Sequence, residues 1–209
     1  MEIPFQYGKI VEDDSFIDRI EDRKELKGFL SNGINTILVS PRRWGKSSLV
    51  KVAMKELAEE DKNIKVCFLD AFKIHSEEEF YDAFASAVIE GVSSTAEKRW
   101  GDFVKYIKSI SPTISFNDSP TTSVSLNLKF DPLKSNAESI LNLPEKMAED
   151  KGVKVIVCID EFQQLANINE WKKLVSTMRS VWQQQHRTTY CLYGSKMHMM
   201  TTIFNNTQS

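Results

Sequence analysis

Four short apolar runs along the chain have the pattern of buried strands. They cover residues 35–39, 64–70, 154–159 and 189–193. Between Lys65 and the terminal Asp70 the second run is continuously apolar, which is typical of a parallel strand buried on both faces. The sequence therefore predicts a mostly parallel sheet.

Segments with helical spacing separate these runs. Apolar residues recur every three or four positions within them, which indicates helices with one buried face. One segment begins with Ser76 and Glu79 in the arrangement of a capping box. The predicted helices cover residues 20–30, 45–60, 76–88, 100–107, 136–150 and 169–185. Strands and helices alternate, so we expect a three-layer α/β fold.

The stretch 111–135 differs in character from the rest. Proline residues at 112, 120 and 132 bound two alternating runs, 113–116 and 123–130, which predict a β-hairpin insertion. We therefore expect one domain over residues 1–209. Residues 1–34 form a lead-in and a helix, and residues 35–70 and 136–209 form the core.

Composition narrows the function only slightly. The 209 residues are 41% hydrophobic and 27% charged, which fits one soluble domain with a sizeable core. The net charge of -2 gives no electrostatic indication that the chain as a whole binds nucleic acid or an anionic membrane. Cys67, Cys158 and Cys191 lie in apolar runs, which indicates core positions. With no signal peptide and no membrane-spanning run, we expect a reducing cytoplasm.

A strand, a loop and a helix follow one another at residues 36–50. Gly45, Lys46 and Ser47 open the helix, as in a phosphate-binding Walker A motif. Backbone N–H groups would cradle the β-phosphate, Lys46 would reach the β- and γ-oxygens, and the Ser47 hydroxyl would bind Mg²⁺. Ser40 stands where the general pattern has its first glycine, and Pro41 favours the turn there.

A pair of acidic residues ends the strand at 154–159. Asp160 and Glu161 would lie at the carboxyl edge of the sheet, where ligands bind in open α/β folds. The pair resembles a Walker B motif. Asp160 would hold Mg²⁺, and Glu161 would polarise the water that attacks the γ-phosphate. The alternative is a strand that merely ends in acidic residues at the surface. The predicted phosphate loop makes that interpretation weaker.

Other polar residues near these motifs admit two interpretations. Ser195 follows the last strand and is a candidate to position the lytic water, although Gly194-Ser195 is also an ordinary turn sequence. Arg42 and Arg43 either contact phosphate or only raise the local potential. Trp44 is more often a loop anchor than a base-stacking residue. Five further polar residues are expected to have no special role. The histidines 75, 186 and 198 lack metal-ligand spacing with any cysteine. Surface polarity explains Gln163 and Gln164 adequately, although they could read nucleotide state.

Taken together, the motifs resemble those of prokaryotic ATPases of the AAA+/STAND group. The elements F-x-G-R, G-P-R-R-x-G-K-[ST]-S-L, h-h-h-h-D-E and h-x-G-S correspond to residues 16–19, 40–49, 156–161 and 192–195, with Asp18 and Ser40 in place of glycines. The resemblance implies sheet order 5-1-4-3-2, with the fifth strand and any helical lid or winged-helix domain beyond residue 209. It also implies an adenine-side role for Phe16 and Arg19. The resulting nucleotide-binding candidates are Phe16, Arg19, Pro41, Arg42, Arg43, Trp44, Gly45, Lys46, Ser47 and Ser48; the catalytic candidates are Lys46, Glu161 and Ser195, and the metal ligands Ser47 and Asp160.

The function expected from these features is an ATP-binding, Mg²⁺-dependent ATPase that acts as a nucleotide-driven switch. The alternative is a nucleotide-binding assembly module or DNA-associated module with little hydrolysis. Self-association or a protein partner is possible in either case, whereas DNA binding by these residues alone is not supported. A small-molecule kinase is a weaker third reading, since no acceptor-binding residues can be identified. The phosphate loop does not distinguish adenine from guanine, but no guanine-reading N-K-x-D motif is present.

Overall fold

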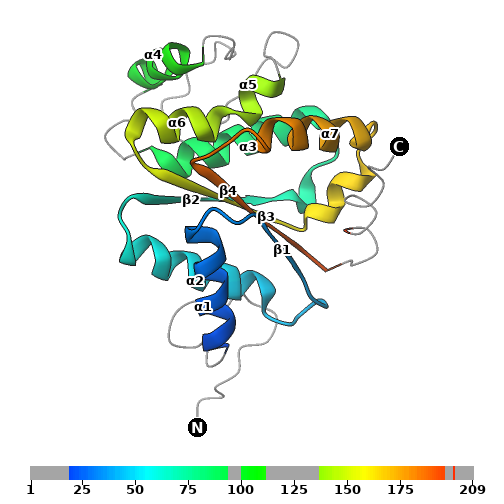
Figure 1. Cartoon of the computed structure of the whole chain (residues 1–209). Helices are drawn as coiled ribbons and strands as arrows, with labels where there is room; N and C mark the ends of the chain where they lie inside the picture. Colours follow the sequence, from blue (N-terminus) through cyan, green and yellow to red (C-terminus); the bar gives the residue numbers. More distant parts are fainter. Residues whose placement is uncertain (1–18, 94–99, 112–136, 196–199, 201–209) are drawn as a thin grey trace.

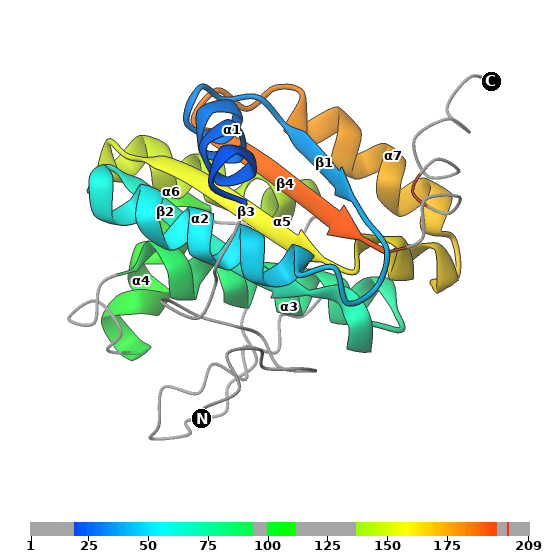
Figure 2. The same cartoon turned by 90° about the horizontal axis from the view of Figure 1, so that it is seen from below.

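Helices cover both faces of a central sheet, as Figures 1 and 2 show. The computed structural model describes residues 19–93, 100–111, 137–195 and 200. One face carries α1 (Ile20–Ser31) and α2 (Lys46–Glu60). The opposite face carries α3 (Glu77–Val92), α5 (Ala137–Leu141), α6 (Leu143–Lys151) and α7 (Trp171–Trp182), and α4 (Trp100–Ile110) contacts α6 from outside. The predicted three-layer α/β fold is confirmed.

Four parallel strands form the sheet in the order β1-β4-β3-β2. They are β1 (Thr36–Val39), β2 (Ile64–Asp70), β3 (Lys154–Asp160) and β4 (Thr188–Gly194). This order agrees with the positions of the four strands in the expected 5-1-4-3-2 sheet. Within the described ranges β1 pairs only with β4, so the fifth strand stays a prediction.

Alternate residues of the two central strands fill two separate cores. Val155, Val157 and Ile159 of β3 face the core beneath α3 and α7. Ile156 and Cys158 of the same strand face the core beneath α1 and α2. This alternation is the period of a strand buried on both faces. All three cysteines are buried, as the sequence predicted, and all three are free thiols.

The outer strand β2 is less buried than its sequence predicted. Phe68 is 41% exposed, although Cys67 and Leu69 on either side of it are buried. The reason is position: β2 lies at an end of the described sheet, beside β3 only. Uninterrupted apolar character therefore indicated a parallel strand correctly, but did not indicate burial on both faces.

Several predicted helices have different bounds in the structure. α3 and α4 continue to Val92 and Ile110, beyond the expected ends at residues 88 and 107. The single helix expected at 136–150 is divided into α5 and α6, and Pro144 occupies the first turn of α6. Proline fits that turn because it lacks an N–H that would otherwise go unpaired. The helix expected at 169–185 begins at Trp171, after Glu170 in a left-handed conformation, and ends at Trp182.

A buried carboxylate fixes the chain where it enters β4. Glu145 on α6 is 5% exposed and accepts hydrogen bonds from the backbone N–H groups of His186 and Arg187, at 2.9 and 3.0 Å, and from Thr188 Oγ1 at 2.8 Å. Three donors satisfy the charge that burial would otherwise penalise. The start of β4 is therefore held in place, and with it the polar residues at the other end of that strand.

Several predictions fall outside the described residues. They are the lead-in up to residue 18, which contains Phe16, and nearly all of the hairpin expected at 111–135. The division of the chain into these parts stays a prediction. Among the described residues, no helix is both long enough and apolar enough to cross a membrane.

Candidate functional site

The loop between β1 and α2 has the backbone shape that a phosphate-binding loop requires. Gly45 precedes α2 in a left-handed conformation, with φ 70°, and Arg43 two residues earlier has φ 68°. Glycine adopts this region without strain, whereas arginine does so at a cost. The first N–H groups of α2, from Lys46 onward, therefore open toward the loop, where the helix dipole favours an anion.

The residues of this loop differ sharply in exposure. Lys46 is 6% exposed, and Ser48 is equally buried. Pro41, Arg42 and Arg43 are exposed, and Trp44 is 67% exposed. Lys46 is thus held inside the site, whereas Trp44 is not buried as a loop anchor would be.

Ser47 and Asp160 meet directly across the site. The Ser47 hydroxyl donates a hydrogen bond of 2.6 Å to Asp160 Oδ2, and the Glu161 backbone N–H donates one of 2.8 Å to Oδ1. Burial raises the pKa of the Asp160 carboxyl, and these two hydrogen bonds and the charge of Lys46 oppose the rise. A carboxylate kept in an unfavourable place beside a hydroxyl and a lysine is a common feature of functional sites.

A hydroxyl and a carboxylate together suit Mg²⁺. This ion prefers hard oxygen ligands, and it usually takes only one or two from the protein, with water and phosphate oxygens as the others. No group of three or more His, Cys, Asp or Glu that could hold a metal occurs in the described part of the chain. The donors Ser47 Oγ and Asp160 Oδ2 therefore fit a metal shared with phosphate and not a cage made by protein alone.

Glu161 is turned back toward the end of β4. Its backbone is left-handed, with φ 48°. Its Oε2 accepts hydrogen bonds from Gln163 Nε2 and from Ser195 Oγ, the latter at 3.4 Å. The structure thus brings Glu161 and Ser195 together, and it places both beside the Ser47–Asp160 pair.

Gln163 is the residue that the sequence interpretation missed. Surface polarity does not explain it, because the residue is 0% exposed. The correction has a physical reason, because residues 162–167 form a 3-10 helix that turns Phe162 and Gln163 inward. Its place just after the acidic pair at the end of a strand could have marked Gln163 as a site residue. Its residue type could not, because glutamine is usually exposed.

Arg19 connects the segment before α1 to the phosphate loop. Its Nη1 donates a 3.2 Å hydrogen bond to the Trp44 carbonyl, and its Nε binds Asp22 Oδ2 at 2.6 Å. Arg19 also has a left-handed backbone, with φ 72°. The expected partner in an adenine-side role, Phe16, lies outside the described residues.

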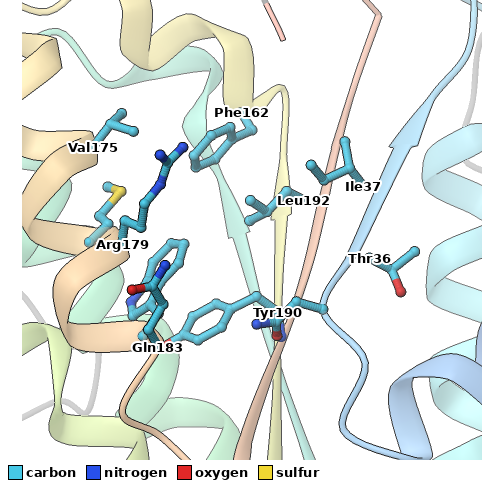
Figure 3. Close-up of a pocket in the computed structure, with 11 residues that line it drawn as sticks. Thr36, Ile37, Phe162, Val175, Arg179, Gln183, Tyr190 and Leu192 are labelled. Carbon is cyan, nitrogen blue, oxygen red and sulfur yellow. The ribbon is translucent and has the colours of Figure 1, made fainter. Parts of the chain in front are cut away.

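A cavity of about 210 Å³ lies elsewhere, between α7 and strands β1 and β4. Figure 3 shows Phe162, Tyr190, Leu192 and Arg179 around it. None of the candidate residues at the phosphate loop lines this cavity. It is therefore a separate apolar space and not the site for phosphate.

Solved structures of archaeal proteins resemble this fold. The Walker-type ATPase of Pyrococcus abyssi superimposes with a TM-score of 0.64 at 20% sequence identity, over 99% of this chain and 53% of that one. The Aeropyrum pernix ORC2 protein, solved in ADPNP–ADP complexes, gives 0.56 at 16% identity over 94% and 47%. Its ADP form gives 0.54 at 16% identity over 89% and 43%. At these identities the likeness concerns the fold.

The chain spans about half the length of these solved relatives. No curated protein matches its sequence. The family profile described as "ATPase domain predominantly from Archaea" matches residues 16–205, which is most of the chain. The phosphate loop, the Ser47–Asp160 pair and Glu161 all lie within that match. The chain therefore belongs to this family of predominantly archaeal ATPase domains.

Proposed function

We propose that this chain binds ATP with Mg²⁺ at the β1–α2 loop and hydrolyses it, acting as a nucleotide-driven switch. The observation that carries the proposal is the 2.6 Å contact between Ser47 Oγ and Asp160 Oδ2. It joins the two motifs that the sequence separates, with the buried Lys46 next to them. Membership of a family of ATPase domains supports the same function.

Each part of the site has a proposed role. The backbone N–H groups after Gly45 and the Lys46 ammonium bind the phosphates and offset negative charge that builds up during transfer. Ser47 and Asp160 would hold Mg²⁺, which supplies further neutralisation of the phosphate oxygens. Arg42, Arg43 and Ser48 are proposed to contact the nucleotide, and Pro41 to shape the loop.

Glu161 is proposed as the general base. The oxygen of a water molecule attacks the γ-phosphorus, and the bond to the β–γ bridging oxygen breaks with the electron pair left on ADP. Glu161 accepts the proton that the water loses, so the products are ADP and phosphate. Ser195, which contacts the same carboxylate, is proposed to position that water.

A contact between Arg19 and the loop supports the switch. The Arg19 hydrogen bond to the Trp44 carbonyl links α1 to the segment that would surround the phosphates. Filling the loop with nucleotide would change that contact, and with it the position of Arg19 at the start of α1. We propose that Phe16 and Arg19 lie on the adenine side of the nucleotide, as the resemblance of the motifs implies, and that Trp44 is a further nucleotide contact.

The test of the proposed function is ATP binding by wild type and Lys46→Ala. Titration calorimetry with ATP and Mg²⁺ should show binding to wild type and strong weakening in the variant, because a charge-assisted contact to phosphate is lost. Lys51→Ala is the matched control, because Lys51 is a half-buried lysine on the same helix but lies outside the loop. Equal affinity of wild type and Lys46→Ala would exclude this site.

A second candidate, an assembly module, is supported by the outer edge of β1. Within the described residues this strand has a partner on one side only, and Ile37 on it is 46% exposed. Unpaired strand edges favour pairing with another chain. Light scattering should then show association that Ile37→Lys reduces, and a monomer at all concentrations would contradict it.

A further inference from the structure

Gln163 is a fully buried amide that the proposed roles do not yet include. Its Nε2 donates a hydrogen bond to Glu161 Oε2. Its Oε1 is buried without a hydrogen-bond partner in the part of the chain that the structure describes. A buried polar side chain normally has both ends satisfied. An unsatisfied oxygen therefore indicates that the orientation of this amide is maintained for something other than its own stability.

Gly194 fixes the other side of the same amide. A Cβ atom added at Gly194 would lie 1.8 Å from Gln163 Oε1, 2.9 Å from Cδ and 3.6 Å from Nε2. These three are the nearest heavy atoms, so every other neighbour is at ordinary contact distance or beyond. The amide of Gln163 lies directly against the Cα atom of Gly194, and only glycine leaves room for it.

The two contacts place the Gln163 amide between β4 and Glu161. Gly194 limits movement away from the carboxylate, and the hydrogen bond limits rotation of the carboxylate itself. Ser195 Oγ reaches the same oxygen, Oε2, at 3.4 Å. Among the described residues Glu161 Oε1 has no such donor, so it is the oxygen left to accept a proton.

We propose that Gln163 is a positioning residue that holds Glu161 Oε2 and so directs Oε1 toward the attacking water. The proposal rests on the function proposed above, in which Glu161 is the general base. A base must lie within hydrogen-bond reach of the proton that it takes, in the correct orientation. Glu161 has a left-handed backbone. Among the described residues, only the side chains of Gln163 and Ser195 form hydrogen bonds with its carboxylate.

The first variant is Gln163→Met, which keeps the length of the side chain but removes the donor. We expect kcat for ATP hydrolysis to fall on the order of 10- to 100-fold, as misplacement of a reacting group does, with ATP affinity unchanged. Rates are expressed per nucleotide-binding site, counted with a fluorescent ATP analogue, so that unfolded protein does not contribute. Gln164→Met, at the next position, is the control and should leave kcat unchanged. A Gln163→Met kcat equal to or above that of wild type would overturn the proposal.

The second test uses the contact with Gly194. Gly194→Ala should displace the amide and lower kcat about as much as Gln163→Met does. In a Gln163→Ala background the added methyl group meets nothing closer than ordinary contact, so Gly194→Ala should cause no further loss. Losses that multiply in the double variant would show that Gly194 acts independently of Gln163, and the positioning role would be wrong.

Glu161→Gln separates the two ways in which this scheme can fail. If Glu161→Gln hydrolyses ATP as fast as wild type, the proposed function itself is wrong. If Glu161→Gln is slow whereas Gln163→Met matches wild type, Glu161 is still the base and only the positioning role is lost. A purely structural role of Gln163 would lower the melting temperature and the number of binding sites, but not kcat per site.

Discussion

Ser47 and Asp160 are 113 positions apart in the sequence, yet Ser47 Oγ donates a 2.6 Å hydrogen bond to Asp160 Oδ2. The two atoms are the proposed metal donors, and here they bind each other. Binding of Mg²⁺ would require this hydrogen bond to open, since the hydroxyl proton points to the oxygen that the ion would take. The contact thus keeps the two donors together before nucleotide arrives.

The first prediction concerns the metal requirement. Asp160→Asn removes the negative charge that attracts the ion, so half-maximal ATPase activity should need a higher Mg²⁺ concentration, and the rate should also fall. Ser47→Ala should shift the Mg²⁺ dependence in the same direction. A Mg²⁺ titration of ATP hydrolysis measures both, and an unchanged midpoint in both variants would exclude this pair as metal ligands.

The second prediction concerns stability without ligand. Burial raises the pKa of Asp160 in the folded protein above its ordinary value of 3.8. The stability linked to its protonation is therefore present below pH 3.8 and lost as pH rises through the raised pKa. At neutral pH, Asp160→Asn should then be more stable than wild type in the absence of Mg²⁺ and nucleotide.

Melting curves at a series of pH values measure this effect. Each kcal/mol gained should raise the melting temperature by about 2–4 °C in a domain of this size. The advantage of Asp160→Asn should shrink as pH falls through the raised pKa, because wild-type Asp160 becomes neutral as well. Addition of Mg²⁺ and ATP should reverse the order. If Asp160→Asn were less stable than wild type at pH 7, the buried charge of Asp160 would not be unfavourable and the prediction would be wrong.

The third prediction concerns the proposed general base. Glu161→Gln keeps the size of the side chain but removes the group that accepts the proton, so ATP should bind while turnover falls by about 10²- to 10⁴-fold. Single-turnover hydrolysis measures the chemical step apart from product release. Glu170→Gln, on an exposed residue preceding α7, serves as the control and should hydrolyse ATP at the wild-type rate.

The fourth prediction concerns the three buried cysteines. Burial raises the pKa of the Cys67 thiol to about 12 and that of Cys158 well above its ordinary value. Only the thiolate reacts readily with iodoacetamide. Native protein at pH 8 should therefore show almost no alkylation by mass spectrometry, whereas denatured protein should be labelled at all three. Rapid labelling of native Cys67 would show that β2 opens from the sheet.

The sequence predicted the strands well because their signals are local. Runs such as Val-Ile-Val-Cys-Ile ending in Asp160 carry both the burial and the position of the strand end. Strand order came from the resemblance to a family and not from the pattern. The pairing of Asp70 with Asp160 across β2 and β3 illustrates why, since nothing near either residue specifies its neighbour.

The rest depended on contacts between distant segments. The burial of Gln163 comes from a 3-10 turn packed against Gly194, and the role of Glu145 comes from three donors over 40 positions away. Polar residues of these types are exposed in most proteins. The division of α5 from α6 did have a clear local signal, because Pro144 starts a helix more readily than it continues one.

The place of β4 in the sheet has a consequence for how the chain is made. It is the last described strand to leave the ribosome, yet it lies between β1 and β3. Until Thr188–Gly194 has been synthesised, β1 has no described neighbour and Cys158 on β3 has no Cys191 opposite. Nascent chains that stop before Thr188 should thus expose two unfilled strand edges, which are sites for chaperone binding or aggregation. The sheet can close only after most of this domain has emerged.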